Sequence, residues 1–154
     1  DAEGRLILAD ALSYATKYKP SLVIDIATLT GAAARAIGHY GIVSMHKNAT
    51  DQHKALKHVG KLTYERLAEM PFWDEYDQLI ESDIADIKNL GGATAGAITA
   101  GKFLANFISY PWIHLDIAGP TFVKNKYNYR GVGATGVGVR LLYYYIKNKF
   151  VSEK

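Results

Sequence analysis

The chain has 154 residues, of which 49% are hydrophobic and 21% charged, and its formal net charge is +3. This size and composition predict one compact domain or one large lobe of a bigger protein, and exclude a disordered tail. The lack of cysteine excludes a disulfide scaffold and thiolate zinc sites. No apolar run approaches the roughly 18–20 residues that a membrane helix needs, and the start has no signal-peptide pattern. We therefore expect a cytoplasmic protein without a membrane partner.

Charge is distributed unevenly along the chain. Residues 124–154 carry seven Lys or Arg against one acid, so this end carries +6 and the preceding 123 residues carry −3. A basic end with interleaved aromatic residues could contact nucleic acid. A total of +3 is a weak electrostatic footprint, however, so we interpret this end as a solvated part of an ordinary enzyme lobe.

The first elements alternate between helical and strand patterns. Apolar residues recur at helical spacing from Leu6 to Ala15 and predict a helix that stops near Lys19, because Pro20 disfavours helical geometry in the residue before it. Residues 21–27 form a β-branched run that is typical of a strand buried on both faces. Residues 41–45 predict a second short strand.

A longer helix is predicted to begin at residues 49–51, with Thr50 as its cap, and to end before Pro71. Its apolar side is expected to carry Leu56, Val59, Leu62 and Leu67.

The second half continues the alternation. Helical patterns cover residues 74–84, 94–108 and 134–147, and residues 112–117 (WIHLDI) predict a third strand. Strands separated by helices indicate parallel pairing through crossover connections. The sequence therefore predicts an α/β fold with three α/β/α layers and a mostly parallel central sheet.

Two loops follow predicted strands, at residues 27–32 and 118–121, and both are rich in small residues. In α/β folds, ligands meet the sheet at the carboxyl ends of strands, and small residues let a substrate approach the backbone closely. Such loops are equally common as structural turns, so position alone leaves both interpretations open.

Three charged residues open the chain. Asp1, Glu3 and Arg5 would share one side of an extended backbone. Carboxylates suit hard divalent cations, and an arginine fork suits an oxyanion. By itself the spacing is weak, because acidic residues ahead of an apolar helix usually interact with its N-terminal dipole.

The wider sequence resembles the leucyl aminopeptidase family, the cytosolic dinuclear-metal aminopeptidases. Residues 1–12 (DAEGRLILADAL) resemble the family signature. Further matching blocks follow in the family's order and span almost the whole chain: 25–32 (DIATLTGA), 82–89 (SDIADIKN), 95–100 (AGAITA) with Phe103-Leu104, 112–119 (WIHLDIAG) and 133–142 (GATGVGVRLL).

The resemblance implies roles for individual residues. Asp1 matches a metal-binding aspartate, Glu3 the glutamate that bridges both metals, and Arg5 the catalytic arginine that holds a bicarbonate ion. The positions that match substrate-contacting loops are Thr28, Leu29, Gly31, Ala118 and Thr121.

The resemblance also implies an activity. It is the hydrolysis of an N-terminal leucine or other apolar residue from peptides, with two divalent metal ions (zinc, manganese or magnesium) and bicarbonate as cofactors, in a homohexamer. In the family, a lysine and two aspartates that bind metal, and a second catalytic lysine, lie upstream of the signature. We therefore expect residues 1–154 to be the C-terminal portion of an aminopeptidase catalytic domain, without its upstream part and N-terminal domain, and to be nearly inactive alone. The alternative is a non-catalytic fragment or scaffold of the same fold.

Residues 131–136 spell G-x-G-x-x-G, so a nucleotide-binding module is a further alternative. The dinucleotide fingerprint needs a hydrophobic strand before it and an acidic residue about 20 positions later. Here the polar segment 124–130 precedes it and the chain ends 18 residues after Gly136. We interpret the glycines as a tight turn that leads into the last helix.

The histidines and two aspartates are interpreted as structural. His53 and His58 lie five apart on one predicted helix, without a His-Glu-x-x-His motif, and are expected at the surface rather than in a metal site. His114 is expected to be a packed, hydrogen-bonded core residue. Asp25 and Asp116 fall within strands, and would need partners if buried.

Overall fold

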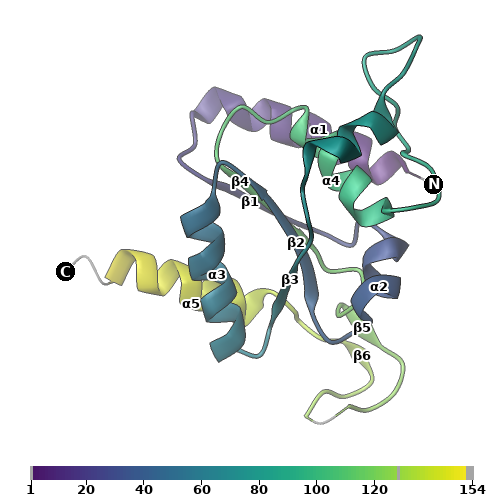
Figure 1. Cartoon of the computed structure of the whole chain (residues 1–154). Coiled ribbons are helices and arrows are strands. Elements are labelled where there is room, and N and C mark those ends of the chain that lie inside the picture. Colours follow the sequence, from purple (N-terminus) through teal and green to yellow (C-terminus); the bar gives the residue numbers. More distant parts are fainter. Residues whose placement is uncertain (1, 128, 152–154) are drawn as a thin grey trace.

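The computed structural model describes residues 2–127 and 129–151. Its main sheet has four strands in the order β1-β4-β2-β3 (Figure 1). The strands are β1 (Val23–Ala27), β2 (Ile42–Lys47), β3 (Leu67–Glu69) and β4 (Trp112–Asp116). Three of them, β1, β2 and β4, are the strands predicted from the apolar runs. β3 is a short edge strand that the sequence did not predict.

The sheet is mostly parallel, as predicted. β1 pairs parallel with β4, and β2 pairs parallel with β3. The exception is the central pair, in which β2 runs antiparallel to β4, with His46 opposite Ile113. The carboxyl end of β2 therefore lies at the opposite edge of the sheet from the carboxyl ends of β1 and β4.

Helices cover both faces of this sheet, which confirms the three-layer α/β/α architecture (Figure 1). They are α1 (Glu3–Ala15), α2 (Gly31–Ile37), α3 (Thr50–Leu62), α4 (Gly96–Ala105) and α5 (Val139–Val151). One core cluster joins Leu56 of α3 and Leu141 of α5 to Ile113 and Leu115 of β4. On the other face, residues of α1 and α4 pack against Trp112 of β4. Alternate residues of β4 thus serve the two layers, as a strand buried on both faces requires.

The helix predicted from residue 49 differs from the observed one at both ends. α3 begins at Thr50 and has Ala49 as its N-cap, so Thr50 is not the cap. It ends at Leu62, and Leu67 lies in β3, where it pairs with Ile42. Leu62 is exposed rather than on the apolar side. The chain changes from helix to strand between Leu62 and Leu67. Because the apolar residues on both sides of this change keep a helical spacing, the sequence pattern did not reveal it.

Several other elements differ in type or extent. Residues Asp74–Ile80 form a 3₁₀ helix, η2, shorter than the predicted helical stretch. α2 was not predicted, and its first two residues, Gly31 and Ala32, were assigned to the loop at residues 27–32. The last helix begins at Val139 rather than residue 134, since Gly133–Ala134 form β6, which pairs with β5 (Phe122–Val123). Gly136 and Gly138 adopt positive φ just before α5, in agreement with the predicted tight turn.

Among the described residues, no helix is long and apolar enough to cross a membrane.

Candidate active site

A cavity of about 500 Å³ lies between the start of α1 and the carboxyl end of β1. Glu3 and Arg5 line it from α1, and Thr28 and Leu29 line it from the loop after β1. Four of the residues predicted as a site are therefore brought together, although the two pairs are more than 20 residues apart in the sequence. Asp1, the predicted metal ligand, lies outside the described residues.

The reason given for grouping Glu3 with Arg5 was wrong, although both residues line the cavity. They were expected to share one side of an extended backbone, whereas both lie in the first turn and a half of α1. Residues two apart in an α-helix are rotated by about 200° around the axis. As a result, Glu3 is exposed, whereas Arg5 is buried at 7% relative exposure. Glu3 in the first turn is also favoured by the helix dipole.

The guanidinium of Arg5 is held in place by a segment that the residue-level predictions did not include. Its Nη1 donates to the main-chain carbonyl of Asn89 at 2.7 Å, and the Asn89 side chain donates to the carbonyl of Ala2 at 3.4 Å. Burial lowers the pKa of Arg5 from its ordinary value, yet an arginine side chain remains charged in proteins. The main-chain carbonyl of Asn89 thus orients a cationic group at the edge of the cavity.

The two loops that were predicted to contact substrate are joined by Asp116, the last residue of β4. Its carboxylate accepts hydrogen bonds from Leu29 N at 3.2 Å, Thr30 Oγ1 at 2.7 Å and Ala118 N at 3.1 Å. Thr30 Oγ1 also accepts from Ala33 N at 3.0 Å, which caps α2. These contacts satisfy the buried carboxylate, so the structural interpretation of Asp116 is correct.

The remaining predicted site residues lie nearby but not on this cavity. Gly31 begins α2 directly behind the Thr28–Leu29 loop. Ala118 donates its N–H to Asp116. The hydroxyl of Thr121 donates to the carbonyl of Ile117, and its own carbonyl accepts from Thr135 N at 2.9 Å. Within the described residues, Gly31, Ala118 and Thr121 therefore do not line the cavity that contains Glu3 and Arg5.

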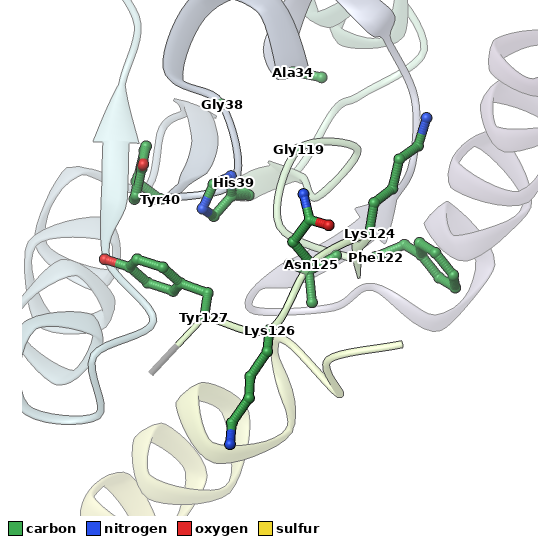
Figure 2. A pocket seen from close by; sticks show the side chains of 11 residues that line it. Ala34, Gly38, His39, Tyr40, Gly119, Phe122, Lys124, Asn125, Lys126 and Tyr127 are labelled. Atoms are coloured by element: carbon green, nitrogen blue, oxygen red, sulfur yellow. The ribbon is translucent and has the colours of Figure 1, made fainter. Parts of the chain in front are cut away.

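A second cavity, of about 430 Å³, lies beside Gly119 (Figure 2). His39, Tyr40 and Tyr127 gather on one side of it, with ring centroids 4.1 to 5.7 Å apart, and Lys124 extends on the other side. None of the predicted site residues lines this cavity within the part of the chain that the structure describes.

Asp25 of the edge strand β1 and His114 of β4 form a buried pair. The Asp25 carboxylate accepts from Trp112 Nε1 and from His114 Nδ1, each at 2.6 Å. His114 is fully buried, which confirms its interpretation as a hydrogen-bonded core residue. His53 was expected at the surface, but it is buried at 1% exposure because the first turns of α3 pack on β2.

Comparison with protein families finds a match over residues 1–143 to the "Cytosol aminopeptidase family, catalytic domain". Two curated relatives are a probable cytosol aminopeptidase of Geotalea uraniireducens, 50% identical over 150 residues, and one of Geobacter sulfurreducens, 50% identical over 148 residues. Each alignment covers 96% of this chain and 30% of the relative. The chain thus spans about 30% of the length of the curated relatives it matches.

A solved structure shares the fold. The tomato leucine aminopeptidase mutant K354E superposes with a TM-score of 0.86 and 37% sequence identity, over 94% of this chain and 28% of that chain.

Proposed function

The chain belongs to the cytosol aminopeptidase family, and from that membership we propose that residues 1–154 form the C-terminal portion of the catalytic domain of a leucyl aminopeptidase. The whole protein would be a metal-dependent hydrolase that releases N-terminal leucine or other apolar residues from peptides. The single observation that supports this most is the cavity in which Glu3 and Arg5 of α1 face the loop after β1.

Glu3 suits a divalent metal ion by its donor chemistry. It is exposed at the cavity, and carboxylate oxygens are ligands for zinc, manganese and magnesium. Two such ions, when bound, would supply Lewis-acid polarisation of the scissile carbonyl and a lowered pKa for a water molecule. Glu3 is the one carboxylate on this cavity among residues 2–127 and 129–151. We propose that Asp1 supplies a second carboxylate and that the remaining ligands come from parts of the protein outside this chain.

Arg5 would bind and orient the bicarbonate that serves as general base. A planar guanidinium matches a carboxylate-like oxyanion through two parallel N–H donors. Because Arg5 is buried and one of its nitrogens is tied to Asn89, its orientation is restricted before the anion arrives. A charged hydrogen bond is also stronger where water is excluded.

The loop after β1 would contact the peptide. The N–H of Leu29 is already occupied by Asp116, so contacts to substrate would fall to the exposed Thr28 and to the Leu29 side chain. Gly31, Ala118 and Thr121 would support this loop or line the pocket for the first residue of the peptide. Ala118 is linked to the loop because its N–H and the Thr30 hydroxyl donate to the same Asp116 carboxylate.

A homohexamer and a cytoplasmic location complete the proposal. α5 exposes Val139, Tyr143, Tyr144 and Ile146, an apolar surface of the kind that a subunit contact would cover. α4, with its small residues, is buried within the chain and does not contribute to that surface. The names of the relatives, which are cytosol aminopeptidases, support the location.

The test is hydrolysis of leucine p-nitroanilide with added manganese or zinc, by residues 1–154 and by the full gene product. We expect turnover from the full gene product and almost none from residues 1–154. Comparable turnover from both would show that residues 1–154 hold a complete active site, and none from the full gene product would contradict the proposed function.

A further inference from the structure

Three metal-binding side chains meet on the face of the sheet that α3 covers. His46 lies near the end of β2, His53 in the first turns of α3, and Glu69 at the end of β3. The Nε2 atom of His46 lies 3.4 Å from Oε1 of Glu69, and Nδ1 of His53 lies 3.8 Å from Oε2. One ligand atom from each residue lies within 4.8 Å of the others, and the described residues contain no other such group of three.

The β2–α3–β3 connection explains why these residues meet. β2 and β3 are parallel neighbours in which Ser44 pairs with Glu69, and α3 is the crossover between them (Figure 1). His46 follows Ser44 by two residues and therefore lies on the same face of β2. His53 extends from α3 toward that face, and the centroid of its ring lies 4.7 Å from the centroid of the His46 ring.

His53 is arranged as a histidine ligand. Its Nε2 lies 2.9 Å from Ser44 Oγ, and burial lowers its pKa to about 4, so the ring is neutral near pH 7. When Nε2–H donates to Ser44, the lone pair of Nδ1 faces the Glu69 carboxylate. A hydrogen bond on the far nitrogen is what orients metal-bound histidines. In the opposite tautomer, the proton would be on Nδ1, but that nitrogen lies 3.8 Å from Oε2 of Glu69, too far for a hydrogen bond.

Glu69 is available as an anionic ligand. The hydrogen bond from Lys57, at 2.9 Å, contributes most to lowering the pKa of Glu69, so the carboxylate is ionised. Lys57 competes for Oε2, but this ion pair is solvent-exposed, and such pairs contribute about 0–1 kcal/mol. The flexible lysine can therefore yield to a divalent ion at little cost.

The geometry points to a binding site for one divalent ion of the zinc type, held by His46, His53 and Glu69. A tetrahedral zinc ion places its ligand atoms about 3.4 Å apart. The separations to the two Glu69 oxygens, 3.4 and 3.8 Å, are close to this value, and ligand atoms separated by up to 4.8 Å would have to move closer together around the ion. Two imidazoles with one carboxylate suit Zn²⁺, Co²⁺ or Ni²⁺ rather than Mg²⁺. His46 and Glu69 are 20% and 39% exposed, which leaves a path for the ion and room for water as a fourth ligand.

This site is separate from the candidate active site. His46 lies opposite Ile113, near the start of β4, whereas Asp116 at the end of β4 holds the substrate loops. Because β2 is antiparallel to β4, the two sites lie toward opposite edges of the sheet. An ion here would link β2, α3 and β3, and would stabilise this part of the fold without touching substrate.

The experiment is a titration of metal-free, untagged chain with Co²⁺ and Zn²⁺, followed by visible absorption and by calorimetry. The Glu3→Gln variant is the background, because it removes the described ligand of the active-site metals. We expect one tetrahedral Co²⁺ per chain, displaced by Zn²⁺, and an increase in melting temperature with Zn²⁺. His46→Gln and Glu69→Gln should each weaken binding by tenfold or more.

His58→Gln is the matched control, since His58 is an exposed histidine on the same helix, and it should bind like the background. His53→Gln is a further test of the same site, but the partly exposed His46 and Glu69 decide the outcome if the buried variant fails to fold. Absence of saturable binding in the background, or equal binding after both His46→Gln and Glu69→Gln, would overturn the proposal.

Discussion

The hydroxyl of Thr30 donates to the carboxylate of Asp116 at 2.7 Å, although the two residues are 86 positions apart in the sequence. This bond joins the loop after β1 to the end of β4, and Leu29 N and Ala118 N donate to the same carboxylate. The buried Asp116 side chain therefore helps to fix the position of the loop after β1, which faces Glu3 and Arg5 across the cavity.

Replacing Asp116 with Ala should destabilise the fold strongly. Three donors would lose their acceptor, and an unpaired buried polar group costs about 1–3 kcal/mol, so we expect a loss of about 3 kcal/mol or more in the free energy of unfolding. Urea unfolding followed by circular dichroism measures this loss. Asp10→Ala, at an exposed position of α1, should change the value by less than about 0.5 kcal/mol. Equal effects from both variants would refute the role of Asp116.

Gly119→Ala should displace the loop at residues 118–121, which follows β4. A Cβ at this position would lie 2.1 Å from the carbonyl oxygen of Gly38, which is backbone and cannot rotate away. We expect a destabilisation of about 1–3 kcal/mol or more. Gly131→Ala is the control, because a Cβ there meets nothing within 4 Å. Thermal unfolding of the two variants side by side would show the difference, and unchanged stability of Gly119→Ala would mean that this contact is absent in solution.

Stability should fall at alkaline pH in part because of Tyr110. Burial and then the Asp25 carboxylate raise the pKa of Tyr110, whose hydroxyl donates to the carbonyl of Leu12 at 2.6 Å. The unfolded chain loses this proton near pH 10, while the folded chain keeps it to a higher pH. Between these values the unfolded state binds fewer protons, so the free energy of unfolding decreases as pH rises.

Tyr110→Phe tests this by urea unfolding from about pH 8 to about pH 11. The variant should lose about 1 kcal/mol near neutral pH, from the missing hydrogen bond, and should show a shallower alkaline decline than the unmodified chain. Tyr18→Phe, at an exposed tyrosine, should leave the alkaline decline unchanged. Parallel pH profiles for the unmodified chain and Tyr110→Phe would contradict the prediction.

In the full gene product, Glu3→Ala and Arg5→Ala should have different consequences. Glu3→Ala should abolish leucine p-nitroanilide hydrolysis and reduce bound metal, because it removes the carboxylate that we propose as the bridge between the metal ions. Arg5→Ala should slow turnover by about 100-fold or more, as loss of a general base does, with metal content mostly retained. Turnover and metal content are measured together, and Glu81→Ala, at an exposed glutamate, should change neither. Normal metal content in Glu3→Ala would exclude the proposed role of Glu3.

The local pattern of apolar residues was sufficient to predict the helices and strands that have a clear hydrophobic period of their own. The apolar period from Leu6 to Ala15 matches α1, and the β-branched runs match β1, β2 and β4. The three-layer architecture follows from those elements, since strands buried on both faces need helices above and below. The family resemblance, carried by ordered blocks along the chain, likewise required only the sequence.

Tertiary structure alone decided which elements are neighbours. β2 pairs antiparallel with β4, and Leu67 lies in an edge strand rather than in a helix. The local hydrophobic period predicted neither feature, because both are determined by contacts with residues that are distant in the sequence. The burial of His53 and its approach to His46 and Glu69 have the same origin. Residue spacing reports the face of an element on which a side chain lies. The sites at Arg5 and at His46 also need a partner from a distant part of the chain, Asn89 for Arg5 and Glu69 for His46. Only the packing of the folded chain determines these partners.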